Sequence, residues 1–92
     1  MAKVLITLRI MPESLETSLE KISEKAVEVI RDNEGELVKK ETKPIAFGLS
    51  ALEITFLLDE SKAGKLESLE ESIKKLEGVQ NAEVIDVRRT FG

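Results

Sequence analysis

The sequence predicts an α+β fold in which residues 1–92 form one domain, a four-stranded antiparallel sheet with two helices on one face. Three observations support this prediction. Four segments have strand-like patterns, two others repeat apolar residues at helical spacing, and the order along the chain is β-α-β-β-α-β. No linker, internal repeat or low-complexity segment interrupts the 92 residues, which are enough for one modest core.

The first strand and helix follow from apolar periodicity. Residues 3–10 alternate, so that one face of a half-buried strand carries Val4, Ile6, Leu8 and Ile10. Pro12 suits the first position of a helix that runs to about residue 32. Its expected buried stripe consists of Leu15, Leu19, Ile22, Ala26, Val29 and Ile30. The helix is expected to end in "DNEG", where Asn33 or Gly35 is available for a left-handed cap.

The second half of the chain, residues 36–89, shows the same kinds of strand and helix pattern. Residues 36–43, "ELVKKETK", form a polar, lysine-rich strand that suits a sheet edge, and residues 49–60 form a central strand. The inward face of the central strand carries Leu52, Ile54, Phe56 and Leu58. Ser61 is the expected cap of a second helix, and Gly78 its expected end. The buried stripe of that helix is Leu66, Leu69, Ile73 and Leu76. Residues 79–89 are the last strand, whose inward face the pattern does not assign.

These elements predict the ferredoxin-like βαββαβ sandwich. Right-handed βαβ connections place both helices on the same face of the sheet. Because this fold carries many unrelated functions, function has to be argued from specific residues.

The composition excludes several classes of function. The chain has no cysteine and no histidine, which removes disulfides, thiolate nucleophiles, the usual zinc sites and imidazole catalysts. We therefore expect neither an enzyme nor a metal or cofactor site. A net charge of −4 and 3% aromatic residues argue against direct nucleic-acid binding. No apolar run reaches the ~20 residues of a membrane span, so we expect a cytoplasmic protein with no membrane contact. Abundant lysine and glutamate are typical of thermophile proteins.

The carboxylates are the first candidates for chemistry. Five glutamates follow the polar face of the first helix: Glu13, Glu16, Glu20, Glu24 and Glu28. No apolar pocket surrounds them, so we interpret them as a solvated face. Asp59 and Glu60 precede the second helix; they suit the capping of its N-terminus better than a metal site with two adjacent ligands.

Two features are not required by the fold. One is the hairpin tip (residues 44–48), Pro44-Ile45-Ala46-Phe47-Gly48, which is apolar where a turn is usually polar. The other is the basic end, Arg88 and Arg89. The tip could fold over the sheet edge as a minor core, and the arginines could be solubilising charge. Together they are typical of a contact surface, since aromatic residues and arginine dominate interface energetics.

The hairpin tip and the strand after it also carry a family resemblance. "KPIAFGLSALEITFLLDESKAG", then "LEESI" and "GVQNAEVIDVRR", resemble archaeal elongation factor 1-beta over the entire chain. That family is similar to the C-terminal exchange domain of its eukaryotic counterparts, which carry Pro-x-Gly-Tyr/Phe-Gly at the tip. This chain has Ala46 in place of the first glycine.

The resemblance implies a single nucleotide-exchange domain over residues 1–92. Its expected function is to promote exchange of GDP for GTP on elongation factor 1-alpha, the GTPase that delivers aminoacyl-tRNA, without covalent chemistry. The resemblance places the docking aromatic of the family on Phe47, flanked by Pro44, Ile45 and Gly48. Eukaryotic members direct a lysine toward the magnesium site of the GTPase, and the matching position here is Arg89, beside Arg88. We expect a monomer that binds this GTPase in its GDP-bound and nucleotide-free states.

Two other classes of function remain as alternatives. A ferredoxin-like regulatory domain that binds a small molecule would need a polar pocket built from loop glycines, and Gly35, Gly48 and Gly64 form no recognisable motif. A small enzyme is disfavoured by the missing acid–base residues. A measurement of GDP release from the GTPase separates all three.

Overall fold

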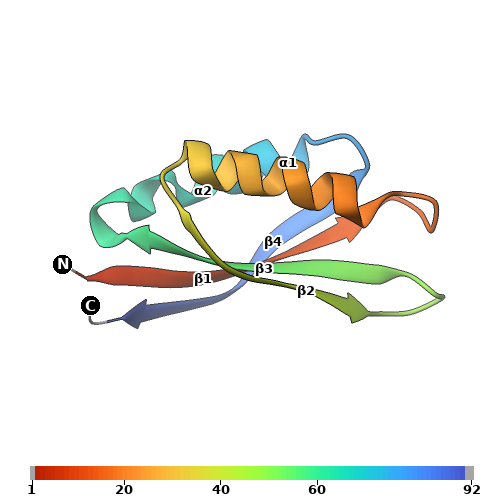
Figure 1. The fold of residues 1–92 in the computed structure, drawn as a ribbon, viewed down its shortest axis with the longest axis horizontal. Coiled ribbons are helices and arrows are strands. Elements are labelled where there is room, and N and C mark those ends of the chain that lie inside the picture. Colours follow the sequence, from red (N-terminus) through yellow and green to blue (C-terminus); the bar gives the residue numbers. More distant parts are fainter. Residues whose placement is uncertain (1, 91–92) are drawn as a thin grey trace.

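The computed structural model describes residues 2–90 and contains seven elements. In chain order they are β1 (Lys3–Pro12), α1 (Leu19–Asp32), β2 (Glu36–Pro44), β3 (Ser50–Asp59), a 3₁₀ helix (Glu60–Lys65), α2 (Leu66–Lys74) and β4 (Val79–Thr90). The predicted β-α-β-β-α-β order is confirmed. Figure 1 shows both helices above one face of the sheet, with the two chain ends at one end of the molecule and the β2–β3 hairpin at the other.

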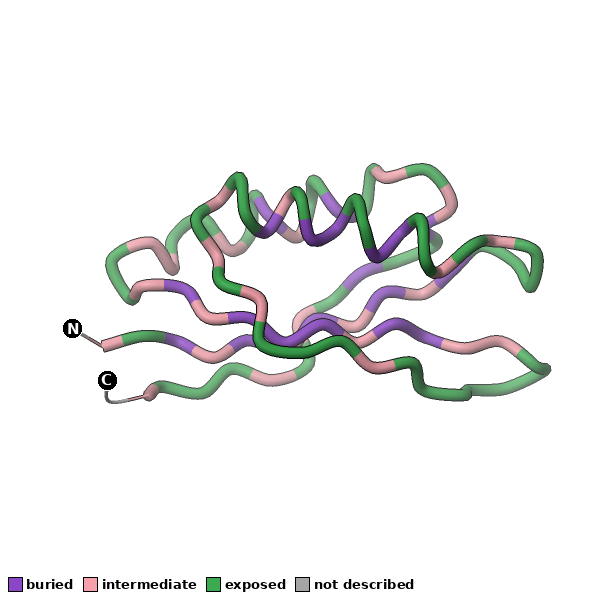
Figure 2. The backbone as a smooth tube through the Cα atoms, viewed as in Figure 1, coloured by how far each residue is buried: buried purple, intermediate pink, exposed green. Residues whose placement is uncertain are grey.

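The strands form a four-stranded antiparallel sheet in the order β2-β3-β1-β4. The central pair is β1 and β3, in which Ile6 lies opposite Phe56 and Leu8 lies opposite Ile54. All four of these side chains are fully buried under the helices. The core therefore lies between the central strands and the apolar stripes of α1 and α2 (Figure 2). The predicted inward faces of both central strands are confirmed.

The predicted start of the first helix was wrong. β1 continues through Pro12, a loop follows over residues 13–18, and α1 begins after Ser18. The Ser18 hydroxyl accepts a hydrogen bond from Lys21 N at 3.3 Å, which satisfies one of the unpaired N–H groups of the first turn. The backbone N–H of Glu13 instead donates to the carbonyl oxygen of Gly78 at 2.9 Å. Leu15 therefore lies outside the core and is 68% exposed.

The end of α1 also differs from the prediction. The left-handed residue is Glu34, with φ 66°, rather than Asn33 or Gly35. Asn33 is the C-cap, and its Nδ2 donates to the carbonyl oxygen of Val29 at 2.8 Å. Gly35 is needed for space, because a Cβ there would stand 2.6 Å from Cγ2 of Ile30. Its lack of a side chain lets β2 leave the helix close to the core.

The second helix is shorter than predicted. Ser61 lies in a 3₁₀ helix that precedes α2, and Asp59 caps this 3₁₀ helix: its carboxylate accepts a hydrogen bond from Ser61 N at 3.2 Å. α2 itself begins after Lys65, which makes no side-chain capping hydrogen bond. α2 ends at Lys74 with Lys75 as its C-cap, so Gly78 does not cap it. Gly78 has φ 88° and lies in the turn before β4, where its backbone passes close to Thr17.

A β-bulge explains why the inward face of β4 was unassigned. Thr7 pairs with Asp86 and Leu8 with Val84, so Ile85 is an extra residue in β4. The bulge shifts the alternation by one residue in mid-strand. Before it, Val79 and Ala82 are buried against the helices. Within residues 2–90, no helix is long and apolar enough to cross a membrane.

Candidate partner-binding site

The hairpin tip closes with a tight turn between β2 and β3. Ile45 N donates to the carbonyl oxygen of Leu49 at 2.8 Å, and Leu49 N donates to the carbonyl oxygen of Ala46 at 3.1 Å. The two central residues of this turn, Phe47 and Gly48, have φ values of 57° and 77°. Positive φ at both positions is the pattern of a type I′ turn, which matches the twist of a hairpin.

Phe47 is held in a costly conformation and is open to solvent. Glycine, asparagine and aspartate are the residues that usually occupy a left-handed turn position, because a Cβ there costs roughly 1–2 kcal/mol. Phe47 nevertheless occupies it, and 92% of its surface is exposed. Ile45 beside it is 39% exposed. The hairpin tip therefore does not fold back as a minor core, and that alternative was wrong.

The basic end lies on β4, where it pairs with the start of β1. Arg89 pairs with Val4, which faces the helices, and Arg88 pairs with Leu5, which faces the open side of the sheet. The two guanidinium groups thus leave opposite faces. Arg88 Nε donates to Asp86 Oδ2 at 2.9 Å.

Glu60 holds the Arg89 side chain from the first turn of the 3₁₀ helix. Arg89 Nε donates to Glu60 Oε2 at 3.2 Å, and a second guanidinium nitrogen bonds the other carboxylate oxygen. The Arg89 side chain is still 68% exposed. An ion pair this exposed contributes little net energy, so the guanidinium is available to another oxygen ligand at small cost.

The predicted solvation of the glutamates is confirmed, but Glu13 and Glu16 lie in the 13–18 loop rather than on the first helix. The five glutamates of the predicted polar face are all exposed: Glu13, Glu16, Glu20, Glu24 and Glu28. Hydrogen bonds from the backbone and the hydroxyl of Ser61 hold the pKa of Asp59 below its usual value, as expected of a helix cap. Among the described residues, no group of three or more acidic side chains is arranged to hold a metal ion.

The structure does not bring the hairpin tip and the basic end together. Arg89 lies beside Val4, and Val4 pairs with Leu58 near the end of β3. The strand from Ser50 to Leu58 alone spans about 27 Å at ~3.4 Å per residue, and Phe47 lies beyond Ser50. The two features therefore occupy opposite ends of a molecule whose longest dimension is 42 Å (Figure 1).

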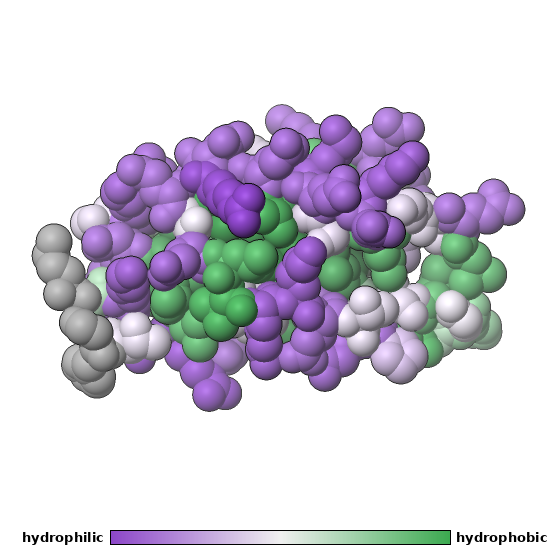
Figure 3. Space-filling view, viewed as in Figure 1, coloured by the Kyte–Doolittle hydropathy of each residue, from purple (hydrophilic) through white to green (hydrophobic). Residues whose placement is uncertain are grey.

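Leu15 is a surface residue that the sequence did not reveal. We predicted it as the first residue of a buried helical stripe, whereas it lies in the 13–18 loop beside the hairpin tip. Apolar spacing cannot distinguish the two cases, because Leu15 stands four residues before Leu19 in either one. The one available signal is Ser18, a strong N-cap residue directly before Leu19. In Figure 3, apolar side chains gather at this end of the molecule.

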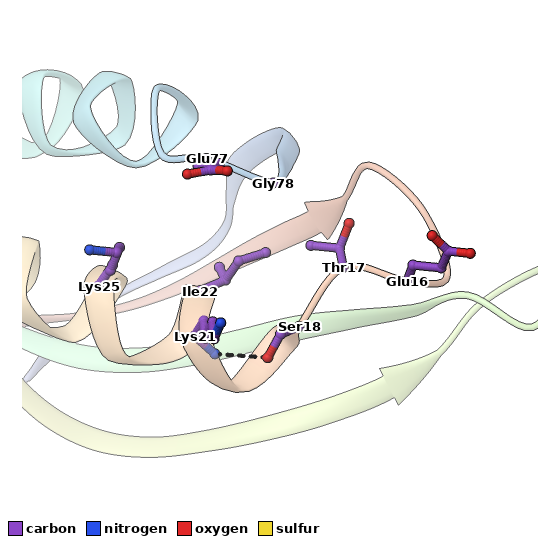
Figure 4. Close-up of a pocket in the computed structure, with 8 residues that line it drawn as sticks. All are labelled: Glu16, Thr17, Ser18, Lys21, Ile22, Lys25, Glu77 and Gly78. Carbon is purple, nitrogen blue, oxygen red and sulfur yellow. Dashed lines mark hydrogen bonds between the residues drawn. The ribbon is translucent and has the colours of Figure 1, made fainter.

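A hollow beside the start of α1 is the place to test the small-molecule alternative. It has a volume of about 360 Å³ and lies between α1 and the turn before β4 (Figure 4). Lys21 and Lys25 of α1 line it together with Glu16 and Glu77. The two positive and two negative side chains balance, and the Ser18 hydroxyl already caps the helix. The hollow thus lacks the convergent polar groups that fix the orientation of a small ligand.

Comparison with known proteins identifies the family. Residues 5–90 match the EF-1 guanine nucleotide exchange domain. The chain belongs to this family. Curated relatives include Elongation factor 1-beta of Metallosphaera sedula, 40% identical over 97% of this chain and 97% of the relative. Another is Elongation factor 1-beta of Methanobrevibacter smithii, 42% identical over 97% of this chain and 98% of the relative. The predicted resemblance to archaeal elongation factor 1-beta is confirmed, and with it an exchange role in translation elongation.

Solved structures support the fold of this exchange domain. The C-terminal domain of the MgtC protein from Mycobacterium tuberculosis aligns with a TM-score of 0.73 and 17% identity, over 89% of this chain and 85% of that domain. The ACT domain from GTP pyrophosphokinase of Chlorobium tepidum aligns with a TM-score of 0.63 and 17% identity, over 90% of this chain and 99% of that domain. At these identities the likeness concerns the ferredoxin-like architecture alone.

Proposed function

We propose that this exchange domain accelerates the release of GDP from elongation factor 1-alpha and so regenerates its GTP form. The observation that carries the proposal is Phe47, which is 92% exposed in a strained left-handed conformation. Strain of this kind persists where a function needs it, and it is common at ligand contacts. Because the chain belongs to the exchange family, the proposed partner for this contact is the GTPase whose nucleotide is exchanged.

Phe47 is the proposed docking anchor. A large aromatic side chain that is free in the isolated protein and buried in a complex provides one of the strongest single contributions to binding. Ile45 supplies additional apolar surface next to it, while Pro44 and Gly48 fix the backbone on either side. We place the GTPase over this end of the molecule.

Arg89 is the proposed group that acts near the bound nucleotide. GTPases hold GDP largely through its phosphates and a bridging Mg²⁺. A guanidinium is planar, permanently charged and suited to paired oxygens. Arg89 is therefore able to compete with the metal for phosphate or carboxylate oxygens of the partner. Arg88, on the other face, contributes positive charge at the same end.

The energetics require only modest differential binding. A factor that binds the nucleotide-free GTPase better than the GDP-bound one lowers the affinity for GDP by the same ratio. A thousandfold effect corresponds to ~4 kcal/mol. One buried aromatic and a few polar contacts are sufficient to supply it. No covalent step is needed, and the proposed factor works as a cytoplasmic monomer without cofactor, membrane or direct nucleic-acid contact.

Stopped-flow release of fluorescent GDP from the cognate elongation factor 1-alpha tests the proposal. We expect release to accelerate with the concentration of this domain and to saturate. An unrelated GTPase under the same conditions controls for general effects on nucleotide binding. A release rate that stays at the value measured without the domain, even at a large excess of the domain, would refute the proposal.

A further inference from the structure

The two neighbouring arginines of β4 are paired with acidic side chains in different ways. Arg88 makes one hydrogen bond, from Nε to Asp86 Oδ2 at 2.9 Å, within its own strand. Arg89 makes two, because Nε donates to one carboxylate oxygen of Glu60 at 3.2 Å and Nη2 donates to the other. Glu60 lies 29 residues before Arg89 in the chain, so the fold rather than the local sequence brings this pair together.

The pair with Glu60 uses only one edge of the Arg89 guanidinium. A guanidinium is planar and carries its N–H donors in a fixed fork geometry. Nε and Nη2 form its inner edge, and both donate to Glu60. The outer edge, formed by Nη1 and the remaining N–H of Nη2, is not used by Glu60, and the side chain is 68% exposed. Paired oxygens of a partner can therefore bind the outer edge while Glu60 keeps the inner one.

Both members of the pair are attached to the start of β1. The backbone N–H of Glu60 donates to the carbonyl oxygen of Ala2 at 3.1 Å. The hydroxyl of Thr90, next to Arg89, donates to the carbonyl oxygen of Lys3 at 3.0 Å. These bonds lie at the end of the molecule where the two chain ends come together (Figure 1). The ion pair thus joins two segments whose backbones are already fixed, and only the side chains have to be ordered when it forms.

We infer that Glu60 is a positioning residue for nucleotide exchange, which holds the inner edge of Arg89 so that the outer edge is oriented for oxygens of the GTPase. The inference rests on the proposed function, because it explains how Arg89 is prepared for its role there. Without Glu60 the guanidinium keeps its charge but samples more rotamers, so fewer encounters place its outer edge correctly. Orienting the group before the partner arrives reduces that entropic cost.

The test measures GDP release from magnesium-loaded elongation factor 1-alpha by stopped flow, with intact chains. Glu60→Gln keeps the size of the side chain, but its amide offers Arg89 one oxygen acceptor in place of two. We expect the maximal release rate to fall about two- to fivefold, because this is the range that an exposed ion pair can contribute. The concentration of the domain that gives half-maximal release should change by less than about twofold, because docking does not depend on Glu60.

Asp86→Asn is the matched control for Glu60→Gln. It removes the same charge from the carboxylate that is paired with the neighbouring arginine, Arg88. We expect a release rate close to that of the wild-type domain, because Asp86 does not contact Arg89. A fall equal to that of Glu60→Gln would show that the net charge of this end, rather than the orientation of Arg89, sets the rate.

The same substitution in an Arg89→Ala background separates positioning from a structural role. If Glu60 acts through Arg89, Glu60→Gln should cause no further slowing once Arg89 is alanine, which is the signature of coupling in a double-mutant cycle. The denaturation midpoint of Glu60→Gln should match that of the wild-type domain. Equal slowing with and without Arg89 would overturn the inference and show a role independent of the guanidinium.

Two further results would also overturn the inference. Faster release by Glu60→Gln would show that the carboxylate restrains Arg89 instead of orienting it. An unchanged rate, with the wild-type domain still accelerating release, would remove Glu60 from the mechanism and leave the exchange function standing. Failure of the wild-type domain to accelerate release would instead refute the proposed function, and the inference with it.

Discussion

Phe47 and Arg89 lie at opposite ends of the same sheet, one at the β2–β3 turn and the other where β4 pairs with the start of β1. A partner that meets both has to extend along most of the 42 Å length of the molecule. Under the proposed function, we therefore expect the two residues to contact separate parts of the GTPase and to have separable roles, docking for Phe47 and nucleotide release for Arg89.

This separation predicts that their effects add. We expect the loss of exchange activity in Phe47→Ala/Arg89→Ala, expressed as free energy, to equal the sum of the single losses within about 0.5 kcal/mol. The measurement is kcat/KM for GDP release with each of the four proteins. A coupling well above that limit would show that the two contacts report on one shared conformational change of the complex.

The backbone strain at Phe47 gives a prediction that separates folding from binding. Phe47→Gly removes the side chain and also relieves the left-handed strain, so we expect the free energy of unfolding to rise by about 1 kcal/mol relative to Phe47→Ala. Both variants should lose at least ~2 kcal/mol of binding to the GTPase. Chemical denaturation and binding titration of the same samples provide the two numbers. A marked fall in stability for both, with binding unchanged, would identify Phe47 as a structural residue.

Substitutions of Gly35 and Gly64 form a matched pair that tests how closely the backbone approaches the core beneath α1. A Cβ at Gly35 would lie 2.6 Å from Cγ2 of the fully buried Ile30, whereas a Cβ at Gly64 would meet nothing within 4 Å. We expect Gly35→Ala to lower the free energy of unfolding by about 1–3 kcal/mol through overpacking. Gly64→Ala should be neutral or slightly stabilising, because it restricts the unfolded chain. Equal effects of the two substitutions would contradict the close approach at Gly35.

The architecture followed from the sequence because its cause is periodic. Alternating residues such as Ile6 and Leu8 have to face one side of a strand, so the pattern alone placed the core. The ends of the helices depend on local hydrogen bonds that compete with one another. For this reason α1 begins after Ser18, which caps it, and not at Pro12. The bulge at Ile85 depends on pairing with β1, which no local pattern in β4 contains.

Only part of the candidate site could be predicted from the sequence, because the rest depends on contacts between segments that are distant in the chain. The sequence singled out Phe47 because an aromatic residue is out of place in a turn. The contact between Leu15 and Gly48 joins segments more than thirty residues apart, and it arises only when the β1–α1 loop and the hairpin meet at one end of the sheet. The left-handed conformation of Phe47 likewise depends on the three-dimensional turn.

The final prediction concerns Arg89, whose position on the helix-facing side of β4 separates it from Arg88. If the guanidinium competes with Mg²⁺ for oxygens of the GTPase, Arg89→Ala should slow GDP release while barely changing the affinity of the complex. The defect should be largest with magnesium-loaded GTPase, because prior removal of the metal makes its displacement unnecessary. Arg89→Lys should retain activity, since it keeps a mobile positive charge at the same place.

Arg88→Ala is the matched control for this experiment, because it removes an equal charge from the neighbouring residue, which lies on the open face of the sheet. We expect it to slow release less than Arg89→Ala does. Stopped-flow release of fluorescent GDP, with and without a magnesium chelator, makes the comparison for all variants. Equal slowing of Arg89→Ala in both conditions would exclude a role at the metal and would make Arg89 an ordinary interface charge, held ready by Glu60.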